Sequence, residues 1–325
     1  MTRAVAWLRR WGISLASLVA GLLTLFVFRR ELPHARWIIG YLLLLWLLVA
    51  LSVQVRERFQ AKRAGRLVLS AADYTIQSLY HAILLFLLPA YWASTTLDSR
   101  NLVFLLLLVA LVLLATFDPL YRAVAERMTA ITDVFFFVSA FAALNVALPL
   151  VGVPQFWALL LSAWIAVVGL APALRRSRGW PWRRALNATA LAGLAVAGLA
   201  FAARAWIPPA PLFLAQATLA RDVSAGEPLE SLGPTIGPND VRGLVAFTAV
   251  YAPAGLRQPI AHVWRREDRI ESVVRLSPIH GGRREGFRTY SRKTVVPTDP
   301  SGRWSVDVVT DSGQLIGRLR FRVEP

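Results

Sequence analysis

The chain has 325 residues, of which 56% are hydrophobic and 17% are charged. Soluble domains carry about 25% charged residues, so this composition excludes a disordered chain and argues against a single soluble domain. The net charge is +17. In residues 1–206, however, most basic side chains stand in short loops between apolar runs, where they attract anionic lipid and set membrane topology, so the charge does not indicate nucleic-acid binding.

Long apolar runs dominate residues 1–207 and predict a polytopic bundle of transmembrane helices. A run of about 20 residues can cross roughly 30 Å of hydrocarbon, and in lipid a helix satisfies its own backbone amides. About seven runs are long enough by this rule. They are Trp11–Phe28, Trp37–Val53, Ala71–Ala93, Leu102–Phe117, Ile131–Val151, Phe156–Leu174 and Ala185–Ile207.

Basic residues are distributed unevenly between the two sides of this bundle. With the N-terminus in the cytoplasm, the inner segments hold 15 Arg and Lys side chains and the outer segments hold five. An excess of basic residues marks the cytoplasmic side of a membrane protein. Because the number of predicted spans is odd, residues 208–325 are then expected outside, in the periplasm of a bacterial cell, with the helices in the inner membrane.

Beyond Pro208-Pro209-Ala210-Pro211 the apolar runs are too short to span a membrane. Alternating apolar and polar residues predict strands instead. The clearest pair is joined by Asp311-Ser312-Gly313, where glycine permits a positive φ. Residues 208–325 are therefore predicted to form an all-β, β-sandwich-like domain. Its strands are expected at Leu244–Ala252, Pro259–Arg266, Arg269–Leu276, Phe287–Val296, Arg303–Thr310 and Leu315–Val323.

The C-terminal domain carries a series of spaced residues. They are His262-x-Trp264, Arg288-Thr289-x-Ser291-x-Lys293, Gly302-x-Trp304-x-Val306-x-Val308, Asp311-x-Gly313 and Phe321-x-Val323. This series resembles a bacterial family, domain of unknown function 2914 (DUF2914), and the organisation of the N-terminal region is similar to DUF5924. The resemblance implies a multi-pass membrane protein with a C-terminal module. It brings no catalytic residue, cofactor or substrate.

The motif residues of the C-terminal domain are expected to be structural. Trp264 and Trp304 are expected to pack in the hydrophobic core rather than to stack on a ligand. His262 shares a strand face with Trp264 and suits a hydrogen-bonded core histidine. The same expectation covers the remaining motif positions that we single out, Ser291, Gly302, Gly313 and Phe321.

Polar residues in the third predicted span form a candidate intramembrane site. Asp73, Gln77 and His81 are four residues apart, so they share one helix face. One interpretation is a proton or ligand path in which His81 titrates. The other is hydrogen bonding between helices, with Asn145 or Asn187 as partner, and we prefer it because a single His does not make a relay.

Two further features concern the packing of the helices. Asp118 and Asp133 are expected at the same end of the bundle as Asp73, where either ion pairing with Arg or a cation site would explain them. The seventh span is rich in small residues, which indicates close helix packing or formation of an oligomer. These small residues are Ala190, Gly193, Ala197 and Gly198.

Basic residues on two predicted strands form a candidate ligand-binding face. Such a face either keeps a solvated sheet from pairing at its edge or binds an anionic glycan, lipid headgroup or protein carboxylate through bidentate Arg contacts. The residues are Arg288, Tyr290, Arg292, Lys293, Arg318, Arg320 and Arg322.

The sequence lacks the common enzyme signatures, such as His-Glu-x-x-His, Gly-x-Ser-x-Gly and the P-loop, and it contains no Cys. We therefore predict no catalytic residue, metal site or cofactor. The expected partners are membrane lipids and an anionic envelope component. The leading hypothesis is an inner-membrane scaffold or sensor with a periplasmic β-domain. The alternatives are a proton-coupled transporter or channel that uses Asp73, Gln77 and His81, and an enzyme acting on a lipid-linked substrate.

Overall fold

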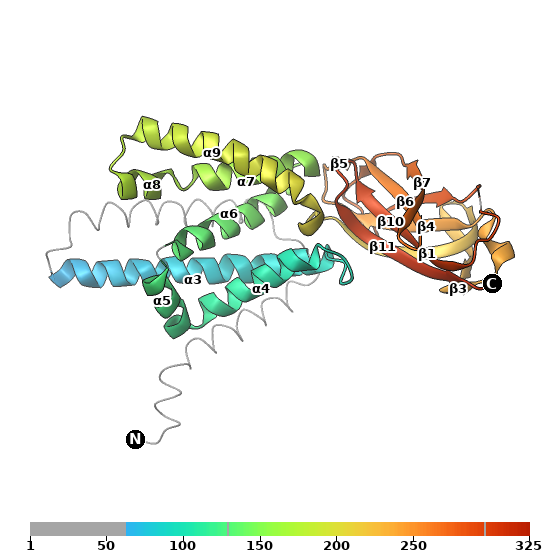
Figure 1. The fold of residues 1–325 in the computed structure, drawn as a ribbon, viewed down its shortest axis with the longest axis horizontal. Coiled ribbons are helices and arrows are strands. Elements are labelled where there is room, and N and C mark those ends of the chain that lie inside the picture. Colours follow the sequence, from blue (N-terminus) through green and yellow to red (C-terminus); the bar gives the residue numbers. More distant parts are fainter. Residues whose placement is uncertain (1–62, 129, 296) are drawn as a thin grey trace, which may run out of the picture. The chain divides into compact units, whose positions relative to one another are not determined.

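The structure is a computed structural model that describes residues 63–128, 130–295 and 297–325 (Figure 1). The predicted spans Trp11–Phe28 and Trp37–Val53 lie outside the described residues. The described chain divides into two compact units. The helical unit holds residues 63–90, 105–147 and 158–202. The β unit holds residues 91–104, 148–157 and 203–325, so it includes two segments that connect helices.

Apolar sequence forms helices throughout the first part of the described chain. Four helical stretches are long and apolar enough to cross a membrane, namely Thr75–Ala93, Ile131–Leu150, Gln155–Arg178 and Trp182–Ala202. The helices themselves are α3 (Arg63–Ala93), α4 (Leu102–Thr116), α5 (Asp118–Arg127), α6 (Ile131–Leu150), α7 (Gln155–Val168), α8 (Ala171–Arg178) and α9 (Trp182–Ala202).

The described residues support four candidate spans, so the predicted count of about seven is not supported. The predicted span Leu102–Phe117 forms α4, which has 15 residues. At 1.5 Å per residue this helix is only about 22 Å long, which is shorter than the roughly 30 Å of a hydrocarbon core. The predicted spans that begin at Ala71, Ile131, Phe156 and Ala185 correspond to the four candidate spans.

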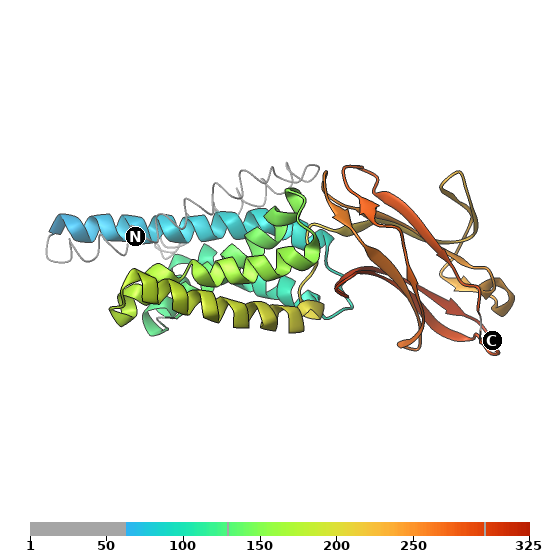
Figure 2. The same cartoon turned by 90° about the horizontal axis from the view of Figure 1, so that it is seen from above.

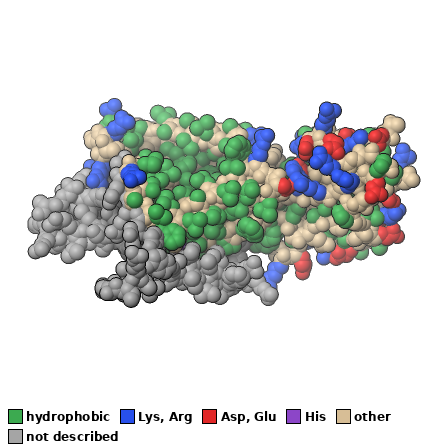
Figure 3. Space-filling view, turned by 60° about the horizontal axis from the view of Figure 1, so that its bottom comes forward, with side chains coloured by type: hydrophobic (Ala, Val, Ile, Leu, Met, Phe, Trp, Pro, Cys, Tyr) green, Lys and Arg blue, Asp and Glu red, His purple; other side chains and the backbone are tan. Residues whose placement is uncertain are grey.

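The helices expose apolar side chains. On α9, Leu191, Leu194 and Leu199 are 63–69% exposed, whereas Gly193 and Ala197 on the opposite face are buried. Figure 3 shows hydrophobic side chains over the surface of the helical unit and charged side chains of both signs over the β unit. A soluble monomer rarely exposes apolar surface of this extent, so the helical unit is compatible with a membrane environment.

Residues 203–325 form strands in two larger sheets and one short pair (Figure 2). The four-stranded sheet has the order β2-β1-β4-β9, and the five-stranded sheet has the order β3-β11-β10-β6-β7. The strands are β1 (Phe213–Ser224), β2 (Glu227–Leu232), β3 (Thr235–Ile236), β4 (Val245–Tyr251), β5 (Arg257–Gln258), β6 (Ile260–Arg266), β7 (Arg269–Arg275), β8 (Ile279–His280), β9 (Phe287–Arg292), β10 (Gly302–Thr310) and β11 (Leu315–Val323).

The two larger sheets share one hydrophobic core. Leu219 and Ala246 come from the four-stranded sheet, and Trp264, Trp304 and Phe321 come from the five-stranded sheet. Phe321 stacks on Trp304 with ring centroids 6.0 Å apart and meets Trp264 edge-on at 6.3 Å. Because inward residues of both sheets interdigitate, the sheets pack face to face. Trp264 and Trp304 are thus core residues.

Six predicted strands correspond to β4, β6, β7, β9, β10 and β11. The predicted hairpin is confirmed, since β10 pairs with β11 and Gly313 in the turn has a φ of +84°. Strands β1 and β2 were not predicted. They form a hairpin whose two-residue turn, Ala225-Gly226, has positive φ at both positions, which is the type I′ geometry that matches the twist of paired strands.

Candidate functional site

The outer face of the five-stranded sheet is rich in arginine. Phe321 and Val323 of β11 point into the core, so the intervening arginines project from the other face. In the register of the sheet, Arg318 and Arg322 lie opposite Asp307 and Arg303 of β10, and Arg265 of β6 pairs with Ser305 of β10. We call this surface the arginine face and define it as Arg265, Arg303, Arg318, Arg320 and Arg322.

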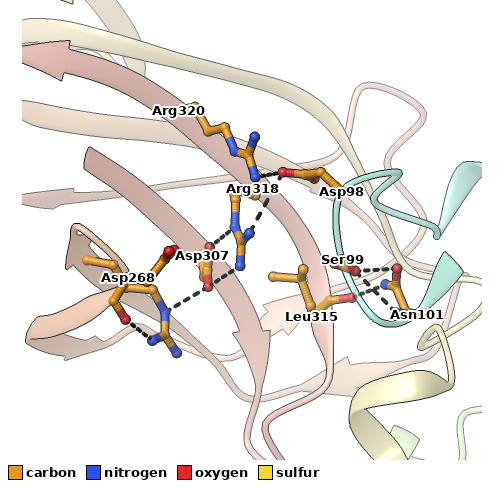
Figure 4. A network of polar contacts seen from close by, with 9 residues as sticks. Asp98, Ser99, Asn101, Asp268, Asp307, Leu315, Arg318 and Arg320 are labelled. Carbon is orange, nitrogen blue, oxygen red and sulfur yellow. Dashed lines mark hydrogen bonds and ion pairs between the residues drawn. The ribbon is translucent and has the colours of Figure 1, made fainter. Parts of the chain in front are cut away.

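A buried carboxylate anchors the arginine face (Figure 4). The side chain of Asp307 is only 5% exposed. Its Oδ1 accepts a hydrogen bond from Arg318 Nε at 2.5 Å, and its Oδ2 accepts from Arg318 Nη2 at 2.9 Å and from Arg265 Nε at 3.0 Å. The bond to Asp307 raises the pKa of Arg318. Three charge-assisted bonds compensate for the burial of this carboxylate and hold both arginines in place.

A second carboxylate reaches the arginine face from the segment between α3 and α4. Asp98 forms an ion pair with Arg320, and its Oδ2 lies 3.8 Å from Nη1 of Arg318. The segment is ordered by Asn101, whose Oδ1 accepts bonds from Thr96 N–H and the Ser99 hydroxyl. Asn101 Nδ2 also donates to the carbonyl of Leu315 at 3.4 Å (Figure 4). This segment is therefore docked along β11.

Within the β unit, hydrogen bonds also connect the start of α7 and the segment after α9 to the turn between β10 and β11. The backbone N–H of Gln155, the first residue of α7, donates to Gln258 Oε1 at 2.9 Å, and Gln258 Nε2 donates to Asp311 at 2.9 Å. Beyond the end of α9, Arg204 Nε donates to the carbonyl of Ser312 at 2.6 Å. The carbonyl of Ile207 accepts from Gln314 Nε2 at 3.1 Å.

The arginine face has an excess of positive charge. Among the described residues, its five guanidiniums form ion pairs with three carboxylates, because Glu267 pairs with Arg303 at 2.9 Å in addition to the contacts of Asp98 and Asp307. Arg320 is 58% exposed at its side chain, and Arg322 is exposed and forms no ion pair among the described residues. Planar guanidiniums at such a surface suit bidentate binding of a carboxylate or phosphate.

The other predicted residues of the ligand-binding face lie elsewhere. Arg288 and Arg292 project from β9 in the four-stranded sheet and pair with Glu227 at 2.7 Å and Asp222 at 2.5 Å, next to exposed Tyr290. The predicted set therefore does not form one surface.

Lys293 has the opposite orientation from its neighbours on β9. It is buried, donates from Nζ to Ser272 Oγ at 3.2 Å and lies 5.5 Å from the ring centroid of Trp304. Burial lowers the pKa of Lys293. Lys293 follows Thr289 and Ser291 in the alternation of the strand, and both of these residues are buried, so it belongs to the inner face.

Three motif residues meet between the two sheets. His262 is fully buried, its Nδ1 lies 2.8 Å from Ser291 Oγ, and its Nε2 lies 3.0 Å from Thr248 Oγ1. Trp264 Nε1 donates to Ser291 Oγ at 2.9 Å, and Thr248 lies 3.3 Å from Thr289.

All polar atoms of this cluster are satisfied if His262 is neutral with its proton on Nε2. Ser291 then accepts from Trp264 and donates to Nδ1, and Thr248 accepts from Nε2. Burial lowers the pKa of His262 to about 4, which fits a neutral ring. Because Ser291 and His262 are closed to solvent, their contact joins the sheets rather than forming a nucleophile that a substrate can reach.

The residues of the predicted intramembrane site are only partly brought together. Gln77 and His81 are buried side by side on α3 and face α4, where Gln77 Nε2 donates to the carbonyl of Ala115 at 3.0 Å and His81 Nδ1 lies 3.5 Å from Thr116 Oγ1. Asn145 is buried on α6, whereas Asn187 is exposed on α9. Asp133 is also exposed. The side chains of Asp73 and Asp118 lie outside the described residues.

The small residues of α9 pack against α7. A Cβ atom at Gly193 would lie 2.8 Å from Trp164 Cδ1, and Trp164 Nε1 donates to the carbonyl of Ala190 at 3.1 Å. Ala197 is buried on the same side, whereas Gly198 is exposed with open space around it. This face of α9 is thus occupied by a helix of the same chain.

Residue types alone did not reveal the most connected members of the site. Asp98, Asp307 and Arg265 were not singled out from the sequence. For Asp307 a signal was present, because a hairpin with its turn at 311–314 puts this residue opposite Arg318. No group of three or more His, Asp or Glu side chains that could hold a metal ion occurs in the part of the chain that the structure describes.

Comparison with known proteins finds two family matches. The model of a family of unknown function (DUF5924) matches residues 1–244, and that of a protein of unknown function (DUF2914) matches residues 257–323. Both resemblances noted in the sequence are thereby confirmed. The first match extends past residue 207 and includes β1, β2 and β3. Neither the curated proteins nor the solved structures yield a match.

Proposed function

The chain belongs to the DUF5924 family, and we propose that it is an inner-membrane sensor or scaffold whose periplasmic β-domain binds an anionic envelope component at the arginine face. The proposal combines candidate spans in the first part of the chain with an exposed, net positive surface on the second. Both families are of unknown function, and the support for a function comes from the geometry of this chain.

The observation that carries the proposal is the contact of Asp98 with Arg320 and Arg318. A carboxylate of the chain itself occupies the guanidiniums that an external carboxylate or phosphate would use. Asp98 follows the candidate span Thr75–Ala93 by five residues. A ligand that competes for Arg320 would therefore release a segment joined directly to a membrane helix, which is a route from ligand binding to the helices.

A binding experiment on the full-length protein in detergent tests this function. The probe is a soluble peptidoglycan fragment that carries free carboxylates, and binding is measured by calorimetry. We expect Asp98→Asn to bind the probe several-fold more tightly than the wild type, because the competing charge is gone. The double variant R320Q/R322Q should lose binding. The matched control is R288Q/R292Q, whose arginines are paired on the other sheet.

The proposal fails if R320Q/R322Q binds the probe as well as the wild type does. It also fails if Asp98→Asn binds more weakly than the wild type, because Asp98 would then support the site instead of competing for it. If the wild type binds neither this probe nor phosphatidylglycerol vesicles, the arginine face is not a recognition surface for envelope anions.

The proposed topology has a cytoplasmic N-terminus and a periplasmic β-domain, and it is supported by the distribution of Arg and Lys in the loops. The chain contains no Cys, so any introduced thiol is unique. A membrane-impermeant maleimide should label Ser224→Cys, in the β1–β2 hairpin, in intact cells. It should label Ser177→Cys, on α8, only after permeabilisation. The reverse pattern would invert the topology.

A second candidate function is proton-coupled transport, supported by the burial of His81 beside Gln77 on a candidate span. It predicts that His81→Ala abolishes a pH-driven flux in proteoliposomes while the protein stays folded. The contacts of both residues with α4 also satisfy a purely structural role, so absence of flux in the wild type removes this candidate without affecting the first.

A further inference from the structure

The turn between α8 and α9 concentrates positive charge without acidic residues. Residues 175–184 contain two tryptophans, Trp180 and Trp182, and no Asp or Glu. The turn joins the candidate spans Gln155–Arg178 and Trp182–Ala202. In a membrane that both spans cross, so short a connection would lie at the level of the lipid headgroups. Its five arginines are Arg175, Arg176, Arg178, Arg183 and Arg184.

The tryptophans hold three of these guanidiniums. Arg178 and Arg184 both lie over the ring of Trp180, at 5.9 and 4.5 Å from its centroid, and Arg175 lies 5.0 Å from the centroid of Trp182. Gly179 has a φ of +63° and closes α8, with its N–H directed at the last carbonyls of the helix. This left-handed residue reverses the chain so tightly that arginines from two helices meet at one indole.

The positive charge at this turn has no carboxylate partner in the part of the chain that the structure describes. None of the five arginines forms an ion pair with a described residue. In the β unit, by contrast, Arg265, Arg288, Arg292, Arg303 and Arg318 each pair with a carboxylate. The C-terminal dipole of α8 offsets only part of the repulsion between neighbouring guanidiniums. A bound anion would offset the repulsion between the two guanidiniums held at one ring.

We propose that this turn is a binding site for the phosphodiester headgroup of an anionic phospholipid. Arg178 and Arg184 present planar donors to the phosphate oxygens, and the tryptophans preorganise them. Trp180 and Trp182 are also residues that settle at the boundary between hydrocarbon and headgroups. A topology signal requires only positive charge, whereas guanidiniums held over indole rings provide the planar donors that recognition of a phosphate uses. The site is independent of the arginine face.

Native mass spectrometry of the full-length protein in detergent tests the proposal. Cardiolipin is titrated against phosphatidylcholine and inorganic phosphate as separate arms. We expect retention of cardiolipin by the wild type and a loss of about 30-fold in affinity for R178Q/R184Q, at about fivefold for each arginine near an anionic headgroup. R178K/R184K keeps the charge but loses the planar fork, and it should show most of the same loss. Trp180→Leu should weaken binding without changing the charge.

The matched control is R283Q/R284Q, which removes two adjacent arginines of the β unit, one of them stacked on Phe287; it should retain cardiolipin as the wild type does. Equal binding by R178Q/R184Q and the wild type overturns the site. Equal binding by R178K/R184K and the wild type overturns the preorganised geometry in favour of simple charge. Equal binding of phosphatidylcholine, or displacement of cardiolipin by inorganic phosphate at equal concentration, overturns recognition of an anionic lipid.

Discussion

Asp307 of β10 and Arg318 of β11 face each other in the register of their hairpin and are joined by hydrogen bonds of 2.5 and 2.9 Å. Arg265 binds the same carboxylate from β6, and Arg318 also lies near Asp98. One buried carboxylate therefore ties together three strands and orients an arginine that faces a segment between two helices. The integrity of the arginine face depends on this residue.

Replacement of Asp307 by Ala should destabilise the β unit by about 3 kcal/mol. The variant leaves Arg265 and Arg318, which are 29% and 18% exposed at their side chains, without their shared carboxylate. Ser305→Ala is the control, because Ser305 precedes Asp307 on the same face of β10, and it should change stability by less than about 0.5 kcal/mol. Thermal unfolding of the full-length protein in detergent, followed by tryptophan fluorescence, gives the comparison. Equal midpoints for D307A and the wild type would show that the arginines do not depend on the carboxylate.

His262 should make the β unit sensitive to acid. Its pKa is about 4 in the folded state and near 6.5 in an unfolded chain. Between these values the unfolded state binds a proton that the folded state does not, so stability is greatest above pH 6.5 and is lost as the pH falls toward 4. The loss amounts to about 3 kcal/mol.

The free energy of unfolding is measured from pH 7 to pH 4 for the wild type and for His262→Gln, and the two pH profiles are compared. His262→Gln should be less stable at pH 7 and should have a flatter profile in this window. His280→Gln, at an exposed histidine on β8, should keep the wild-type slope. A wild-type slope in His262→Gln would assign the acid sensitivity to other groups.

Gly193→Ala should weaken the packing of α9 on α7. The new Cβ would lie 2.8 Å from Trp164 Cδ1 and 3.2 Å from the Trp164 carbonyl oxygen, which is backbone and cannot swing aside. We expect a loss of about 1–3 kcal/mol from overpacking. Gly198→Ala, on the same helix but with open space around it, should be neutral or slightly stabilising because Ala favours helix. The midpoint of thermal unfolding in detergent reports both, and equal effects would contradict the close contact.

Gln77→Leu should cost the helical unit about 0.6–1.7 kcal/mol, which is the range for interhelical hydrogen bonds in membranes. The substitution removes the bond to the carbonyl of Ala115. Ser78→Ala is the control on the next, exposed position of α3. The measurement is unfolding by a denaturing detergent, monitored by circular dichroism. A Gln77→Leu protein as stable as Ser78→Ala would mean that the bond to α4 contributes nothing.

Strands with strict alternation were predictable because one face of each is buried. Trp304, Val306 and Val308 of β10 are buried in the core, as their spacing indicates. Strand β1 was missed because its burial does not alternate, and a register shift between Leu214 and Gln216 interrupts its pairing with β4. Alternation of apolar and polar residues does not identify a strand whose pairing is interrupted by a β-bulge.

The contacts of the arginine face were predictable only within the hairpin. The pairing of Asp307 with Arg318 follows from the register of adjacent strands. The contact of Asp98 with Arg320 joins positions far apart in the chain, and no local pattern encodes it. Lys293 shows a different failure. Its basic character suggested the outer face with Arg292, although its place in the alternation puts it with buried Ser291.

The docking of the α3–α4 segment on β11 also bears on how the protein is made. Asn101 and Leu315 are 214 positions apart, so the segment leaves the ribosome long before the strand that receives it. Until β11 is synthesised, Arg318 and Arg320 are absent, and the segment lacks its contacts with the sheet. Formation of this contact is thus a late step in biogenesis. An interrupted or truncated chain without β11 would leave the α3–α4 segment without these contacts and exposed to quality-control proteases.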